Sequence, residues 1–77
     1  MKIAATILSL AAERGKQKTI CPSEVARMLW PKEWRQHMEE VRSIAFELRN
    51  LGKVLITQKG NEVLGDTVTG PIRIQIK

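Results

Sequence analysis

The chain has 77 residues, 43% of them apolar, so it is long enough for one small domain and too apolar for a disordered segment. Its 13 Lys and Arg residues against 8 Asp and Glu give a formal net charge of +5, which favours a polyanionic partner. One cysteine excludes an internal disulfide, and one cysteine with one histidine cannot build a zinc site alone. We expect a single domain over residues 1–77 in the reducing cytoplasm. The alternative interpretation of the charge is an ordinary solvated basic surface.

The first expected element is a helix over Lys2–Arg14. Ile3, Ile7 and Leu10 recur at helical spacing, and Gly15 is a natural C-terminal stop. The apolar start resembles a signal peptide, but charged residues follow it at once and the small core needs this helix. No apolar run approaches the ~20 residues that span a bilayer, so no membrane association is expected.

A second helix is expected over Pro22–Leu29, because proline is preferred at the first helical position. Cys21 is then the residue before the helix, and Glu24 lies where a capping carboxylate reaches back to it. Thr19–Ile20, just upstream, can pair briefly as a strand. Pro31 separates this helix from the next, because a proline disfavours helix in the residue before it.

A third helix is expected over Lys32–Leu51, ended by Gly52. The turn between the second and third helices is short, as a helix-turn-helix requires. Its apolar positions share one face and consist of Trp34, Met38, Val41, Ala45 and Leu48.

Two strands are expected after the helices, over Val54–Gln58 and Ile72–Ile76. Lys59–Glu62 carries a turn signal, and Val63–Thr69 is expected to form a longer wing loop. Three helices followed by a hairpin predict an α+β domain of the winged helix-turn-helix type.

Enzymatic chemistry finds little support in the sequence. Cys21 and His37 are the only nucleophile and base of the kind that catalysis pairs, and we interpret both as structural. Glu39 and Glu40 point about 100° apart on a helix, so they do not form a carboxylate pair. No glycine-rich phosphate loop is present. We therefore expect no enzyme, no cofactor, no metal and no small-molecule substrate.

The third helix carries the most specific binding signal. Arg35, Arg42 and Arg49 are seven residues apart and are expected to form one row on its exposed side. Arginines contact phosphate or guanine, whereas amides and hydroxyls contact base edges. A neighbouring row of such polar side chains contains Gln36, Ser43 and Asn50.

Other interpretations of this helix stay open. Glu39 is close enough in sequence to pair with Arg35 or Arg42, and acidic residues on the same helix oppose a DNA backbone. Phe46 is expected on the exposed arc, where it stacks on a base, serves a dimer contact or packs beside Arg42. The sequence does not decide whether three further cations, Lys16, Lys18 and Arg73, contact a ligand. Trp30 and Trp34, on either side of the turn between the second and third helices, are interpreted as packing residues.

Five segments carry a resemblance to a known family. They are CPSEVAR at 21–27, WR at 34–35, VR at 41–42 with Ala45, ITQKG at 56–60 and GPIR at 70–73. In this order, over about Ile20 to Ile76, the chain resembles the DUF3253 family of small, mostly bacterial domains of unknown function. The resemblance implies a winged-helix fold, and it implies no activity and no binding residue.

These observations lead to one main hypothesis and two alternatives. The hypothesis is a module that binds double-stranded DNA, with the third helix in the major groove and the wing beside it. A protein-interaction module or homodimer of the same fold is the chief alternative, and RNA binding is the third. In the main hypothesis Arg35, Gln36 and Ser43 approach bases, and the phosphates are held by Lys32, Arg42, Lys53 and Lys59.

Overall fold

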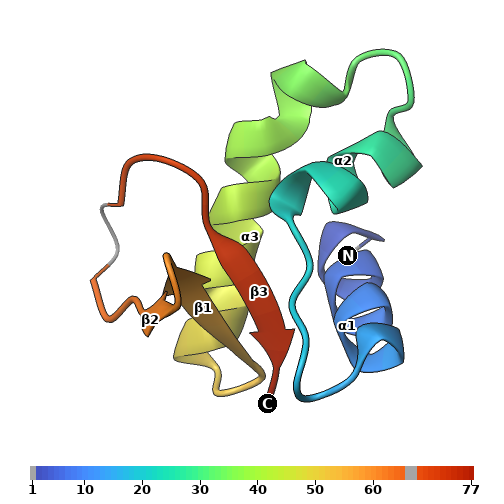
Figure 1. Cartoon of the computed structure of the whole chain (residues 1–77). Helices are drawn as coiled ribbons and strands as arrows, with labels where there is room; N and C mark the ends of the chain where they lie inside the picture. Colours follow the sequence, from blue (N-terminus) through green and yellow to red (C-terminus); the bar gives the residue numbers. More distant parts are fainter. Residues whose placement is uncertain (1, 66–67) are drawn as a thin grey trace.

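The computed structural model describes residues 2–65 and 68–77 as an α+β domain of three helices and a three-stranded antiparallel sheet (Figure 1). Residues 66 and 67, which belong to the expected wing loop, lie outside the described residues. The elements in chain order are α1 (Lys2–Arg14), α2 (Pro22–Leu29), the 3-10 helix η1 (Trp34–His37), α3 (Met38–Asn50), β1 (Val54–Gln58), β2 (Asn61–Glu62) and β3 (Arg73–Ile76).

The sheet has the order β2-β1-β3, so its central strand is β1. Val54 pairs with Ile76 and Ile56 pairs with Ile74, and these side chains alternate toward the helices. On the far side of β3, Ile20 and Ile74 exchange two main-chain hydrogen bonds of 2.8 Å. The brief strand pairing predicted at Thr19–Ile20 is therefore confirmed, and it ties the α1–α2 connection to the sheet.

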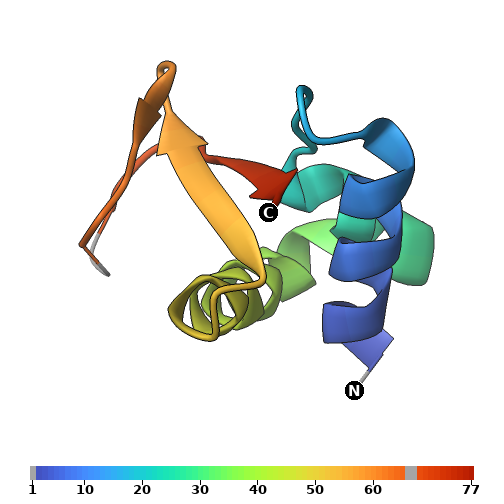
Figure 2. The same ribbon diagram turned by 90° about the horizontal axis from the view of Figure 1, so that it is seen from below.

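The core lies between the sheet and the helices. Figure 2 shows β1 and β3 on one side of α3, and α1 contacts both β3 and α3. Because α1, α2, α3, β1 and β3 all contribute apolar side chains to this one cluster, none of these elements has a core of its own. The buried residues are Ile3, Ile7, Ala11, Ile20, Val25, Ala26, Val41, Ala45, Leu48, Val54, Ile56, Ile72 and Ile74.

The predicted bounds of α1, α2 and β1 are confirmed. The helical boundary at Pro22 has the expected cap, since the Cys21 N–H donates to Glu24 Oε2 at 2.8 Å. Because Pro22 has no N–H, a hydrogen bond at that position is not required. The sequence signals of this helix are thus local ones, and they suffice to place it.

The predicted third helix was wrong at its N-terminal end. Residues 31–33 form a turn and η1 precedes α3, so the α-helix begins at Met38 instead of Lys32. The Gln36 N–H donates to the Glu33 carbonyl at 3.0 Å, which is the tighter 3-10 pattern. Stacking of His37 on Trp30, with ring centroids 3.7 Å apart, accompanies this tighter turn.

The last strand lies where it was predicted, with β3 beginning at Arg73, one residue after Ile72. Before β3 begins, the side chain of Gln58 hydrogen-bonds to the main chain of this segment. Its Nε2 donates to the carbonyls of Thr69 at 2.7 Å and Pro71 at 3.2 Å, where a ladder of strand hydrogen bonds would otherwise continue. In the described part of the chain, no helix is both long and apolar enough to cross a lipid bilayer.

Candidate nucleic-acid interface

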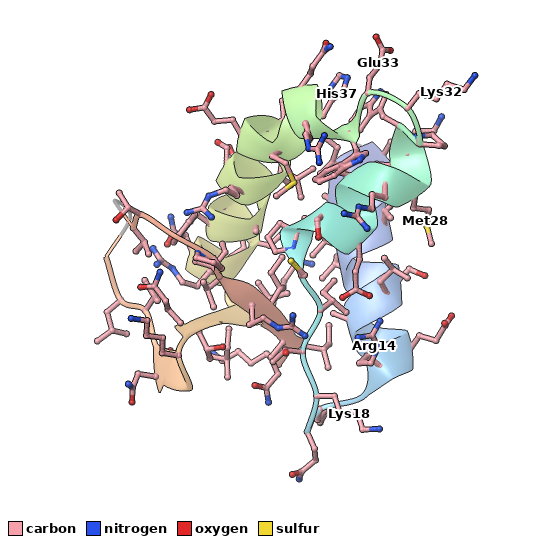
Figure 3. All side chains as sticks on the ribbon, turned by 45° about the horizontal axis from the view of Figure 1, so that its top comes forward. Arg14, Lys18, Met28, Lys32, Glu33 and His37 are labelled. Atoms are coloured by element: carbon pink, nitrogen blue, oxygen red, sulfur yellow. The ribbon has the colours of Figure 1, made fainter. Side chains whose placement is uncertain are left out.

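Three of the predicted site residues lie together at the N-terminal end of α3. Lys32 is in the turn after α2, and Arg35 and Gln36 are on η1, with all three side chains exposed. Figure 3 shows Lys32 and Glu33 projecting outward from this end of the molecule, with His37 beside them and Lys18 at the opposite end. The short turn thus gathers polar side chains where the second and third helices meet.

Two arginines at the N-terminal end of α3 contact the ring of Trp34. The guanidinium carbon of Arg27 lies 4.2 Å from the centroid of the Trp34 ring, and that of Arg35 lies 4.8 Å from it. Both distances are within the range of a cation–π contact. Trp34 itself is half-buried and packs against the core, so the ring has a fixed position. Arg27 is therefore a member of the site that sequence reasoning missed.

These cations are not neutralised within the described residues. Across residues 2–65 and 68–77, neither Arg27, Lys32 nor Arg35 lies within ion-pair distance of a carboxylate. The pair between Arg35 and Glu39 that sequence spacing allows is not formed. Because no carboxylate holds them, the three cations are available to an external anion.

Arg42 hydrogen-bonds within the chain instead of extending into solvent. Its guanidinium donates to the carbonyls of Val68 at 2.7 Å and Gly70 at 2.9 Å, and the side chain is half-buried. Two helical turns further along α3, Arg49 donates a hydrogen bond to the carbonyl of Gly65 at 2.7 Å. The expected exposed row of arginines is thus wrong beyond Arg35, because the next two hold the segment between β2 and β3 against the helix.

A shallow groove of about 520 Å³ runs along α3 beside this segment. The prediction that Phe46 is exposed was wrong, since it is half-buried and packs against the core. Its cation partner is Arg49, whose guanidinium carbon lies 4.9 Å from the ring centroid. Ser43 is exposed in the groove among acidic residues. The lining consists of Glu39, Arg42, Ser43, Phe46, Glu47, Asn50, Val68 and Thr69.

The two remaining predicted residues lie apart from each other. Lys59 is exposed in the turn between β1 and β2, where it has a φ of 53° beside Gly60 with 84°. Lys53 is exposed just before β1, and its carbonyl accepts a hydrogen bond from the Lys77 N–H at 3.3 Å. Since α3 rises about 20 Å over its length, Lys53 is distant from the cations at the other end of that helix.

A separate polar cluster joins α1, α2 and β3. Arg14 contacts Glu24 at 2.5 Å, and Arg73 donates to Thr19 Oγ1 at 2.9 Å. The hydrogen bond from Arg14 lowers the pKa of Glu24 below its ordinary value of 4.5 and, reciprocally, the pKa of Arg14 is raised. Arg73, whose role the sequence left open, therefore packs over the α1–α2 connection. Lys16 and Lys18 are exposed in that connection.

Potential metal ligands, Cys21 and His37 have the following surroundings in the described part of the chain. No group of three or more potential ligands gathers among residues 2–65 and 68–77. Cys21 precedes α2 and contacts Ser23 Oγ at 3.1 Å. His37 is engaged by Trp30 and by Glu40, whose Oε1 is 2.7 Å from its Nδ1. The two residues thus have separate structural contacts.

Comparison with protein families matches residues 1–77, the whole chain, to a family described as "Protein of unknown function (DUF3253)". A comparison with curated proteins found no match. The family match extends over every element described above, from α1 to β3. The chain therefore belongs to the DUF3253 family.

Proposed function

We propose that the chain is a winged-helix module that binds double-stranded DNA through the N-terminal end of α3. The topology supports the winged-helix assignment. Two helices joined by a short turn precede the sheet, and the segment between α1 and α2 pairs with β3 through Ile20 and Ile74. In such a fold the second helix of the pair enters the major groove.

The observation that carries the proposal is the group of exposed cations at the α2–α3 turn. Arg27, Lys32 and Arg35 lie at this end without a carboxylate partner among the described residues. Unpaired cations on a small basic domain lower the free energy of binding to a phosphate backbone by releasing its counterions. Gln36, exposed beside them, supplies an amide for base edges.

The wing contributes one cation to the proposed interface, and Arg42 supports the wing instead of contacting phosphate. Lys59 is the exposed cation at the hairpin turn, and it contacts phosphate beside the groove. Arg42 acts indirectly, because its hydrogen bonds to the carbonyls of Val68 and Gly70 hold the wing segment on α3. Ser43 lies further along α3, and Lys53 lies at its far end, so neither carries the proposal.

One observation favours a second candidate function, a protein-interaction module of the same fold. The groove along α3 combines the ring of Phe46 with the exposed carboxylates Glu39 and Glu47. An apolar floor with acidic rims suits a basic protein segment better than DNA. DNA would instead contact the turn before α3, where Arg27, Lys32 and Arg35 have no described carboxylate within ion-pair distance.

A binding titration tests the proposed function. Duplex DNA of random sequence, labelled with a fluorophore, is titrated with the chain at several salt concentrations. Lys32→Gln and Lys59→Gln should each lower the log–log salt slope by about 0.9, the value of one phosphate contact. Lys77→Gln is the matched control, since it removes the same charge at the opposite end of the domain and should leave the slope unchanged. Equal effects of all three substitutions would contradict a localised interface.

A further inference from the structure

We propose that Arg27 and Arg35, whose guanidinium carbons both lie over the ring of Trp34, form a clamp for neighbouring phosphates of one nucleic-acid strand. This inference rests on the proposed function and names the residues that bind the backbone most tightly. Arg27 comes from α2 and Arg35 from η1, so the clamp bridges both halves of the helix-turn-helix. Trp34 is the shared platform.

The geometry fits a strand of phosphates. The two guanidinium carbons lie 4.2 and 4.8 Å from one ring centroid, so they are separated by no more than these two distances together. A DNA strand carries one phosphate per about 3.4 Å of helix axis. Two cations held close to one ring can therefore contact neighbouring phosphates of one strand.

The stacking leaves the binding atoms available. The guanidinium carbons of Arg27 and Arg35 lie over the Trp34 ring, and each guanidinium carries five N–H donors. Across the described residues, the N–H groups of Arg27 and Arg35 have no hydrogen-bond acceptor within the chain. A phosphate oxygen can accept from two such donors at once, which favours phosphodiester over a lone halide or water.

Two like charges near one ring also need an anion. Arg27 and Arg35 carry like charges near one ring, and no described carboxylate lies within ion-pair distance of either. Contact with the half-buried ring restricts both side chains, which lowers the conformational entropy that they lose on binding. Lys32, exposed in the same turn, extends the positive surface along the strand.

Binding of a short labelled DNA duplex across a salt series tests the clamp. Arg27→Gln should lower affinity at low salt by about tenfold or more and reduce the salt slope by about 0.9. Arg27→Lys keeps the charge but loses the planar fork, so it should keep the slope and lose part of the affinity. Lys77→Gln is again the charge-matched control, and thermal unfolding verifies that each variant is folded.

The outcomes separate the two proposals. If wild-type protein binds with a steep salt dependence and Lys32→Gln and Arg35→Gln weaken binding while Arg27→Gln behaves like Lys77→Gln, the clamp is overturned and the proposed function stands. If Arg27→Gln, Lys32→Gln and Arg35→Gln all behave like Lys77→Gln, both are overturned. If wild-type protein binds no duplex at any salt concentration, both are overturned. Loss of affinity in Arg27→Gln with recovery of the slope in Arg27→Lys supports the clamp, since a merely structural arginine would not separate slope from affinity.

Discussion

The guanidinium of Arg42 donates a 2.9 Å hydrogen bond to the main-chain carbonyl of Gly70, which lies 28 residues further along the chain. A second donor of the same group reaches the carbonyl of Val68 at 2.7 Å. Gly70 has a φ of 90°, a conformation that a side chain would strain. One arginine of α3 thus fixes the end of the wing segment just before β3.

Replacing Arg42 by alanine should therefore destabilise the fold. Hydrogen bonds from a charged donor contribute about 1.5–3 kcal/mol, so Arg42→Ala should lower the free energy of unfolding by about that amount. Ser43→Ala, at the exposed neighbouring position, should change it by less than about 0.5 kcal/mol. Urea unfolding of both variants provides the measurement. Equal stability of the two variants would mean that Arg42 does not hold the wing.

The two candidate functions are separated by Arg35 and Phe46. A DNA-binding module should lose most affinity for duplex DNA in Arg35→Ala, because a charge-assisted contact contributes about 1.5–3 kcal/mol. An interaction module should instead lose self-association or protein binding in Phe46→Ala, since aromatic anchors dominate such interfaces. Arg42 is unsuitable for this comparison because it holds the wing.

Sedimentation and DNA titration of both variants provide the readout. Because Phe46 is half-buried, its alanine variant is compared only after thermal unfolding shows a folded domain. Loss of an oligomer in Phe46→Ala, together with undetectable DNA binding in every form, would favour the interaction module.

The hairpin turn offers a prediction that links stability to binding. Lys59 has a φ of 53°, which a lysine adopts less readily than asparagine. Lys59→Asn should therefore raise the free energy of unfolding by a few tenths of a kcal/mol while lowering the DNA salt slope by about 0.9. Gly60→Ala, at a φ of 84°, should destabilise the hairpin by about 1 kcal/mol. If Lys59→Asn leaves the salt dependence of DNA binding unchanged, the wing makes no phosphate contact through this residue.

The Arg14–Glu24 contact predicts a pH dependence of stability. The pKa of Glu24 is lowered from 4.5 in the folded chain, chiefly by the hydrogen bond from Arg14. Its stabilising contribution is therefore fully present above pH 4.5 and is lost as the pH falls through the lower folded pKa. Glu24→Gln should be less stable than wild type at pH 7, and the difference should shrink below pH 4.5. A constant difference between pH 7 and pH 3 would contradict this assignment.

Local signals in the sequence suffice for most of the fold. Pro22 and Gly15 bound α2 and α1 because proline and glycine act on their own backbone positions. The start of α3 does not follow from such signals, since Trp30 and His37 meet only in the folded turn. Helical periodicity alone favours a regular helix at this point, whereas the folded chain has a 3-10 turn in which His37 stacks on Trp30.

The candidate site is predictable only in part, for the same physical reason. The exposure of Lys32, Arg35 and Gln36 follows from helical spacing and the turn. The hydrogen bonds from Arg42 join residues 26 and 28 positions apart, and no local pattern encodes such a pairing. Arg27 likewise meets Trp34 across the break between two helices. Contacts of this kind appear only once the elements are packed.

Mapping of main-chain amides by NMR during titration with duplex DNA tests the central claim most directly. The account predicts that the largest shift changes occur at residues 27 and 32–36, with a second set at residues 59–60 of the hairpin turn. These changes should disappear as salt is raised, because the contacts are made to phosphates. Largest changes along the groove at Ser43, Glu47 and Thr69, or no changes at low salt, would contradict it.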